Sequence, residues 1–227
     1  MNGSPKTVGL GGGTVVAIDG PGASGKSTVS RLVAARLDLP HLDTGAYYRA
    51  ATVAGLRSGT DLGDEPAMAD LIQRTSFDQV GDRMYLDGED VSDAIRLPEV
   101  TNSVSIVAAH ADVRKALVEQ QRAWVATHEQ RAVVEGRDIG SIVFPGASLK
   151  IYLDASPDVR AWRRAGETGE AVSRVLVEQE RRDKIDSTRT VSPLVVPTDA
   201  IVIDTTDLSI DDVVARVVDL AGKSSSG

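Results

Sequence analysis

The sequence predicts an α/β fold in which a parallel sheet is covered by helices on both faces, giving three layers. Short β-branched runs alternate with longer segments of helical periodicity, and a glycine-rich loop joins the first predicted strand to the first predicted helix. One segment in the middle of the chain departs from this alternation and contains closely spaced turns. A chain of 227 residues is long enough for one sizeable domain with small insertions.

Apolar runs that are rich in β-branched residues predict the strands. The first, Val15 to Ile18, is continuous rather than alternating, which is typical of a strand that is buried on both faces. We expect strands at residues 14–19, 131–135, 149–153 and 200–203.

Longer segments with apolar residues at helical spacing predict the helices, and most of them begin at a polar residue that can cap the helix. Ser156 precedes a proline that suits the first helical turn, and Ser209 opens the last helix. We expect helices at residues 25–37, 45–57, 64–75, 97–107, 111–128, 156–165, 170–184 and 209–221.

Residues 76–93 form the segment that departs from the α/β alternation. Residues 77–80 and 84–86 have the composition of strands, and a Gly-Asp pair at 81–82 joins them. An Asp-Gly pair at 87–88 indicates a second turn. The pattern predicts a small antiparallel insertion.

Composition excludes several classes of function. The net charge of −8 and the pI of about 4.9 argue against a broad nucleic-acid surface, so any anion site is local. Zero cysteines exclude disulfides, thiolate metal sites and a cysteine nucleophile. No apolar run approaches the roughly 20 residues of a membrane span, and the first 14 residues lack the apolar core of a signal peptide. We expect a cytoplasmic protein with no nucleic-acid or membrane partner.

The most informative motif is Gly-x-x-x-x-Gly-Lys-Ser at residues 20–27, directly after the first predicted strand. Its backbone N–H groups and the following helix N-terminus can cradle phosphates. Lys26 is then expected to reach the β- and γ-phosphates of a nucleoside triphosphate, and the Ser27 hydroxyl to hold Mg²⁺ as the metal ligand. The predicted cofactor-binding residues are Gly20, Pro21, Gly22, Ala23, Ser24, Gly25, Lys26, Ser27 and Thr28.

Further charged clusters suggest a second anion site. Arg49 lies one turn into a helix that a glycine turn opens, and Arg137-Asp138 stand between glycines where a predicted strand ends. Ligands of open α/β sheets bind beyond the carboxyl ends of strands. An ordinary helix start and an ordinary charged turn are the structural alternatives.

Arg182, Asp186 and Arg189 are spaced by four and three residues, so they share one helix face. Taken alone, this stretch favours a solvated, salt-bridged helix surface. Ser105 and Arg114 carry no signal on their own.

Taken together, the motifs closely resemble those of bacterial cytidylate kinases, in order across roughly residues 14–220. The matching stretches are the glycine-rich loop, Asp43-Thr-Gly-Ala-Tyr-Tyr-Arg49, Gly88-Glu-Asp-Val-Ser92 with Ile95-Arg96, Glu135-Gly-Arg-Asp-Ile-Gly140, Val143-Phe-Pro145 and Arg182-Asp-x-x-Asp-Ser-x-Arg189.

The resemblance implies a P-loop kinase core, a helical lid and a monophosphate-binding domain that the antiparallel strands enlarge. The implied reaction transfers the γ-phosphoryl group of ATP to CMP or dCMP with Mg²⁺, and the implied state is a monomer. The implied parts are a flexible N-terminal tail at 1–13, a core at 14–42, 97–155 and 190–222, a monophosphate-binding region at 43–96, a lid at 156–189 and a flexible tail at 223–227.

The resemblance also implies residue roles. Arg49, Arg137 and Arg189 would hold the acceptor phosphate, and Arg182 and Asp186 would reach the ribose and phosphates. Thr44 belongs to the same substrate site, and Ser105, Arg114 and Asp138 would read the cytosine. The catalytic set is Lys26, Arg137, Arg182 and Arg189, and one of Arg160, Arg163 and Arg164 is a further candidate for contact with ATP.

The chemistry of the bases is consistent with this assignment. Cytosine presents an amino donor at N4 where uracil presents an oxygen, so oxygens of Asp138 and Ser105 would attract the first and repel the second, while Arg114 would donate to N3 or O2. No general base is needed, because a phosphate with a second pKa near 6 is largely ionised at neutral pH.

Two other functions compete with this one. A kinase for a small alcohol such as shikimate would need an aspartate base, for which Asp43 is the candidate. A non-catalytic nucleotide switch would need a guanine-reading Asn-Lys-x-Asp pattern, which the chain lacks.

Overall fold

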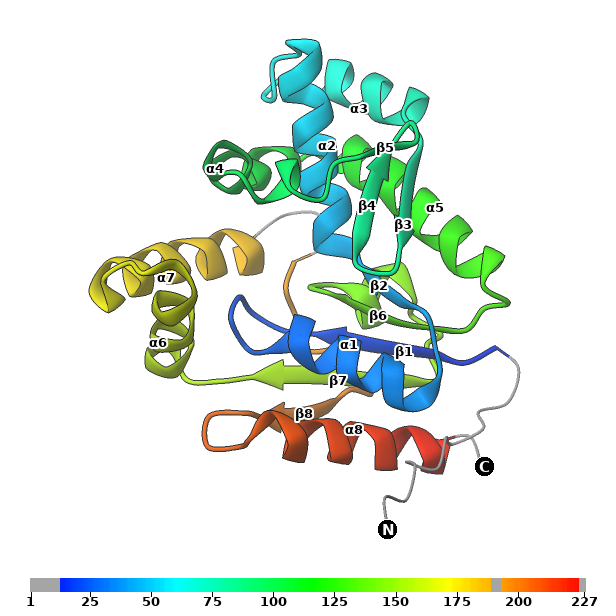
Figure 1. Cartoon of the computed structure of the whole chain (residues 1–227), viewed down its shortest axis with the longest axis vertical. Coiled ribbons are helices and arrows are strands. Elements are labelled where there is room, and N and C mark those ends of the chain that lie inside the picture. The colour runs from blue at the N-terminus through cyan, green and yellow to red at the C-terminus, as the bar shows by residue number, and fades with distance from the viewer. Residues whose placement is uncertain (1–12, 189–192, 225–227) are drawn as a thin grey trace. The chain divides into compact units, whose positions relative to one another are not determined.

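A computed structural model describes residues 13–188 and 193–224 (Figure 1). The chain divides into two compact units: unit 1 is Met1–His41 with His128–Gly227, and unit 2 is Leu42–Thr127. Residues 98–127, expected in the core, thus group with unit 2, because the helices they form pack on its other helices. The division into core, monophosphate-binding region and lid stays a prediction about function.

Unit 1 is built on a parallel sheet. Strand β1 pairs with β6 and with β7, and in this register Asp19 lies opposite Gly136 and Tyr152. The last residues of neighbouring strands therefore lie at one edge, where ligands of α/β sheets bind. The strand order is β2 (His41–Asp43), β6 (Ala132–Gly136), β1 (Val15–Asp19), β7 (Leu149–Asp154), β8 (Ile201–Asp204).

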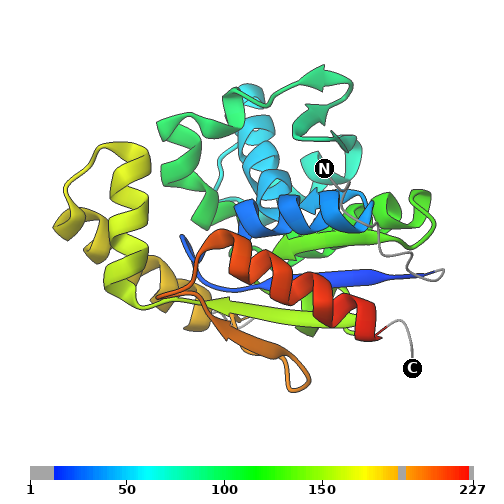
Figure 2. The same ribbon diagram turned by 60° about the horizontal axis from the view of Figure 1, so that its bottom comes forward.

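Helices α1 (Lys26–Leu37) and α8 (Ile210–Ser224) lie side by side on one face of this sheet (Figure 2). Val33 of α1 and Val217 of α8 are fully buried against Ile151 of β7 and its neighbours. Each large aliphatic side chain buried in this way stabilises the fold by about 1.5–3 kcal/mol. Every residue of β1 is buried, as expected for a strand covered on both faces.

Helices α6 (Pro157–Thr168) and α7 (Val172–Thr188) pack against each other through Ala161, Ala165 and Val175. Ser156 caps α6, because its hydroxyl accepts a hydrogen bond from the Val159 N–H at 3.4 Å. Gly169 ends α6 in the left-handed conformation, with φ 74°. The pair follows β7 directly.

Unit 2 combines helices with a small antiparallel sheet. Helix α2 packs against α4, and α3 against α5. The indole N–H of Trp124 on α5 donates to the Gln79 carbonyl at 2.9 Å, which holds the sheet on that helix. The elements are α2 (Thr44–Ser58), α3 (Glu65–Arg74), β3 (Phe77–Val80), β4 (Arg83–Leu86), β5 (Glu89–Asp90), the 3₁₀ turn η1 (Ala94–Arg96), α4 (Pro98–Val107) and α5 (Ala111–Thr127).

The predicted strands, helices and antiparallel insertion are all confirmed, with ends that differ by a few residues. The sequence pattern did not predict strand β2 or the turn η2. Strand β2 has three residues, too few to show periodicity. The π-helical turn η2 (Ile139–Val143) depends on a contact with a residue far away in the chain. Within the described part of the chain, no helix has both the length and the apolarity that crossing a membrane requires.

Candidate functional site

The glycine-rich loop at residues 20–25 follows β1 directly, as predicted. A Cβ on Gly20 would lie 2.0 Å from the Leu153 carbonyl oxygen, so the neighbouring strand leaves room only for glycine. Gly25 is left-handed, with φ 92°, and makes no side-chain cap to α1. The first N–H groups of α1 thus lack a protein side chain as a cap, which suits the binding of an anion.

Other residues of unit 1 hold the loop in place. The Lys26 ammonium donates to the Pro21 carbonyl at 2.7 Å. The Thr205 hydroxyl donates to the Ser24 carbonyl at 3.2 Å, and Arg163 donates to that hydroxyl at 3.1 Å. The loop conformation is therefore fixed by protein contacts before any nucleotide arrives.

Glu135, for which the sequence suggested no role of its own, lies at the end of β6 and contacts the first turn of α1, directly after the glycine-rich loop. Its Oε2 accepts a hydrogen bond from the Ser27 hydroxyl at 2.8 Å, and its Oε1 lies 3.1 Å from Nε2 of His41. The carboxylate is 3% exposed. The available signal was an acidic residue at the carboxyl end of a strand next to the one that leads into the loop.

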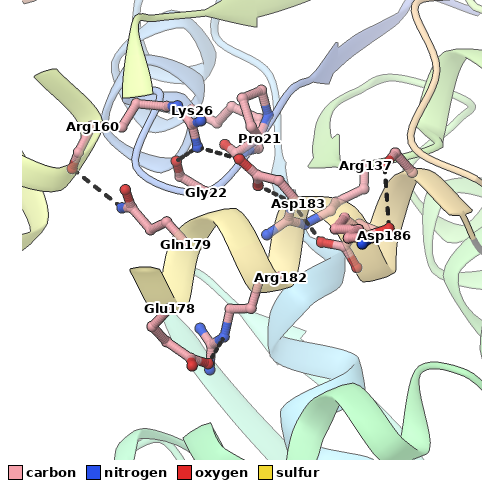
Figure 3. Close-up of polar contacts among 12 residues, drawn as sticks. Pro21, Gly22, Lys26, Arg137, Arg160, Glu178, Gln179, Arg182, Asp183 and Asp186 are labelled. Carbon is pink, nitrogen blue, oxygen red and sulfur yellow. Dashed lines mark hydrogen bonds and ion pairs between the residues drawn. The ribbon is translucent and has the colours of Figure 1, made fainter. Parts of the chain in front are cut away.

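Arg137 lies against the same loop. A Cβ built on Gly22 would be 3.4 Å from Nη2 of Arg137. Nη1 of Arg137 is 2.7 Å from Oδ2 of Asp186 and 3.8 Å from Oδ1 of Asp183, both on α7 (Figure 3). The structure thus brings Arg137 and Asp186, both predicted site residues, together beside the loop.

Arg160 is the buried member of the three candidate arginines on α6. Its guanidinium donates to the carbonyl oxygens of Ala155 at 3.1 Å and Gly22 at 3.2 Å. Nη1 also lies 2.7 Å from Oδ2 of Asp183 (Figure 3). Asp183 therefore contacts Arg160 and Arg137, and this ion-pair chain links α7 to the glycine-rich loop. The third candidate, Arg164, pairs with Glu167 on the surface at 2.9 Å.

Asp138 and Arg182 are the remaining predicted site residues of unit 1 that the structure describes. Asp138 is buried, and its carbonyl accepts hydrogen bonds from the N–H groups of Ile142 and Val143. Arg182 lies on the face of α7 that carries Glu178, with its Nε 3.3 Å from Oε1 of that residue, rather than in the cluster around Arg137 (Figure 3). Arg189 lies outside the described residues.

In unit 2, Asp43, the candidate base of the alcohol-kinase alternative, caps α2. Its carboxylate accepts a hydrogen bond from the Ala46 N–H at 3.1 Å. Thr44 is buried as the first residue of α2, and Arg49 donates from Nη1 to the Thr101 hydroxyl on α4 at 3.1 Å. Thr44 and Arg49, both predicted substrate-binding residues, thus lie on α2, and Arg49 links this helix to α4.

Arg114 of α5 is buried although its side chain is charged: it is only 3% exposed. It lies on the apolar face of that helix. Its guanidinium carbon lies 5.1 Å from the centre of the Tyr48 ring, and Nη1 donates to the Ala108 carbonyl at 3.2 Å. Ser105 is half-buried on α4, one turn before Ala108. Two of the three residues named as base readers, Ser105 and Arg114, therefore belong to neighbouring parts of unit 2.

Comparison with known proteins decides between the functions that the sequence left open. A family model described as cytidylate kinase matches residues 16–223. The chain belongs to the cytidylate kinase family. The cytidylate kinase of Rhodococcus jostii (strain RHA1) is 48% identical over 213 residues, which cover 90% of this chain and 93% of that protein. The cytidylate kinase of Mycobacterium leprae (strain Br4923) is 47% identical over 216 residues, which cover 93% of this chain and 96% of that protein.

A solved structure of an uncharacterized protein from Eubacterium ventriosum ATCC 27560 matches 92% of this chain and 98% of its own, with a TM-score of 0.51 and 13% identity. At that identity the match supports the fold alone. The expected family is confirmed, and with it a nucleoside-monophosphate kinase that transfers a phosphoryl group from ATP to CMP. The alternatives of an alcohol kinase and a nucleotide switch are thereby excluded.

Proposed function

We propose that this chain carries out the transfer as a Mg²⁺-dependent reaction, with CMP and dCMP as acceptors, at the carboxyl ends of β1 and β6. One observation carries the proposal. The Arg137 guanidinium lies against Gly22 of the loop that is built to hold the donor phosphates. Planar guanidinium groups bind phosphate through two parallel hydrogen bonds, so this juxtaposition suits two phosphates that must meet end to end.

The protein's task is to neutralise and align these phosphates. Lys26 leaves the Pro21 carbonyl to bind the β- and γ-phosphates, and Arg137 binds the acceptor phosphate. Arg49 and Arg189 are proposed to bind the acceptor phosphate with it, and Arg182 and Asp186 to contact the ribose and phosphates. A helical lid formed by α6 and α7 would exclude water that otherwise hydrolyses ATP.

The residues around Ser27 fit a Mg²⁺ ion. Mg²⁺ prefers a few oxygen ligands and keeps most of its waters, and Ser27 with the Glu135 carboxylate supplies two oxygens that already contact each other. No group of three or more acidic, histidine or cysteine side chains suited to a metal occurs among residues 13–188 and 193–224. When bound, Mg²⁺ neutralises charge on the donor phosphates.

Glu135→Gln tests this fit. We expect the Mg²⁺ concentration for half-maximal activity to rise about 10-fold, because the amide lacks the charge that holds the hydroxyl and the metal's water. The measurement is a Mg²⁺ titration of initial rate at saturating ATP and CMP, and Glu119→Gln on the exposed face of α5 is the control. An unchanged titration curve for Glu135→Gln would remove Glu135 from the proposed metal site.

Asp138, Ser105 and Arg114 are proposed to read the cytosine. A site that relies on such hydrogen bonds rejects the wrong base strongly, because its polar groups are then left unpaired. We expect Asp138→Asn to lower the ratio of kcat/KM for CMP to that for UMP by about 10- to 100-fold, since the new amide group faces N4 of cytosine but can donate to O4 of uracil. A ratio equal to that of the wild type contradicts the assignment.

A coupled assay with ATP and a panel of CMP, dCMP, UMP, AMP and GMP tests the proposed function as a whole. We expect ADP formation with CMP and dCMP at rates well above those with the other acceptors. Turnover of a small alcohol without turnover of CMP would overturn the proposal. The expectations of a monomer and of a cytoplasmic protein stay predictions.

A further inference from the structure

Asp19 is a buried carboxylate that the mechanism above does not use. It is the last residue of β1 and directly precedes the glycine-rich loop, and it is 1% exposed. Burial raises the pKa of Asp19 to about 6, against the opposing effect of two backbone hydrogen bonds. A buried charge is costly unless hydrogen bonds compensate for the water it has lost. The two backbone hydrogen bonds to Asp19 therefore indicate that this carboxylate has a structural role.

Both oxygens of this carboxylate accept from consecutive backbone groups of η2. The Ile139 N–H donates to Oδ1 at 2.7 Å and the Gly140 N–H to Oδ2 at 2.7 Å. The first N–H groups of a helical turn have no partner within it, and π-helical turns are rare and common at functional sites. Asp19 therefore supplies, from 120 residues away in sequence, the acceptors that this turn requires.

These bonds fix one particular peptide group, the one between Asp138 and Ile139. Its N–H is held by Asp19, and its carbonyl accepts from Ile142 at 2.9 Å and Val143 at 3.1 Å. A peptide plane held at both ends leaves the preceding residue little freedom in ψ. The direction of the Asp138 side chain thus depends on Asp19, although Asp19 ends β1 and Asp138 lies between β6 and η2.

We propose that Asp19 is a positioning residue for specificity: by holding the N–H groups of Ile139 and Gly140, it sets Asp138 for the acceptor base. The inference rests on the proposed role of Asp138. Asparagine cannot substitute for Asp19, because its amide group would place a donor against one of the two N–H groups. The same carboxylate joins the end of β1, which leads into the glycine-rich loop, to the turn that follows Asp138.

The test uses the full chain with Asp19→Asn, and measures kcat/KM for CMP and for UMP together with KM for ATP. We expect the CMP to UMP ratio to fall about 10-fold, the equivalent of about 1.4 kcal/mol, while KM for ATP changes less than about 3-fold. Asp154→Asn is the matched control: Asp154 ends β7 on the other side of β1, and its carboxylate accepts only from the neighbouring Ala155 N–H at 2.9 Å among the described contacts. We expect that control to leave the ratio unchanged.

A rise in KM for ATP with an unchanged ratio would overturn the inference, because Asp19 would then serve the loop alone. Asp19→Ser keeps one acceptor and introduces no amide donor, so it gives the same readout if the asparagine variant does not fold. A ratio unchanged in the serine variant would also overturn the inference.

The double variant Asp19→Asn with Asp138→Asn separates this inference from the proposed function. If Asp19 acts through Asp138, the double variant should show about the same ratio as Asp138→Asn alone, whereas independent effects would multiply. If Asp138→Asn alone leaves the ratio unchanged, the proposed base-reading role fails. If it lowers the ratio and Asp19→Asn does not, only the present inference fails.

Discussion

Lys26→Met should lower kcat by about 10³-fold, the loss expected when a donor aimed at developing transition-state charge is removed. The substitution keeps the aliphatic stem of the side chain and removes only the ammonium group. That group already lies over the glycine-rich loop, 2.7 Å from the Pro21 carbonyl, so it needs only to change acceptors when ATP binds. We expect KM for CMP to change much less than kcat.

The measurement is steady-state turnover of ATP and CMP, with folding checked by thermal denaturation. The control is Lys115→Met, which removes a lysine from the exposed face of α5 and should leave kcat within about 2-fold of the wild type, as is usual for surface substitutions. A Lys26→Met enzyme that keeps a tenth or more of the wild-type kcat would contradict the role assigned to this residue.

Arg137→Met should lower kcat/KM for CMP by about 10³-fold, since an arginine that stabilises a transferring phosphoryl group is worth about 10³–10⁵ in rate. The guanidinium lies between Gly22 of the loop and the α7 carboxylates, so its loss removes positive charge where the two nucleotides meet. KM for ATP should rise far less than KM for CMP.

Arg137→Lys distinguishes charge from geometry. Lysine restores the positive charge but not the planar fork, so it should recover only part of the loss. Arg122→Met, on the exposed face of α5, is the control for a general effect of removing an arginine. Equal increases in KM for the two nucleotides would move Arg137 out of the acceptor site.

The parts of the fold that depend on local pattern could be predicted from the sequence. The strand Val15 to Ile18, the glycine-rich loop and the helix after it are contiguous, and the local sequence of each one predicts its structure. The same holds for the hairpin of β3 and β4, whose turn residues are specific.

Contacts between distant residues could not be predicted in this way. The bonds from Ile139 and Gly140 to Asp19 and the contact of Ser27 with Glu135 join residues more than 100 positions apart. No periodicity or spacing carries such information. The resemblance to a family named Asp138 as a reader of the base, but it did not indicate what holds Asp138 in place.

The three candidate arginines of α6 show the same limit. Arg160, Arg163 and Arg164 all fall within a stretch of five residues, so the sequence cannot say which of them is buried. The structure separates them by what they meet: Arg160 contacts the loop and α7, Arg163 contacts Thr205, and Arg164 pairs with an exposed glutamate. Burial here is decided by the packing of α6 on α7, a tertiary property.

The ion pair between Arg137 and Asp186 has a thermodynamic consequence for α7. An anion that binds this guanidinium competes with the Asp186 carboxylate, so loss of the ion pair and binding of the anion are thermodynamically linked and share one coupling free energy. Reciprocity then requires that a change which strengthens only the ion pair between Arg137 and Asp186 weakens binding of the competing anion by the same factor. The Asp186 carboxylate is thus a built-in competitor of the acceptor phosphate for the Arg137 guanidinium.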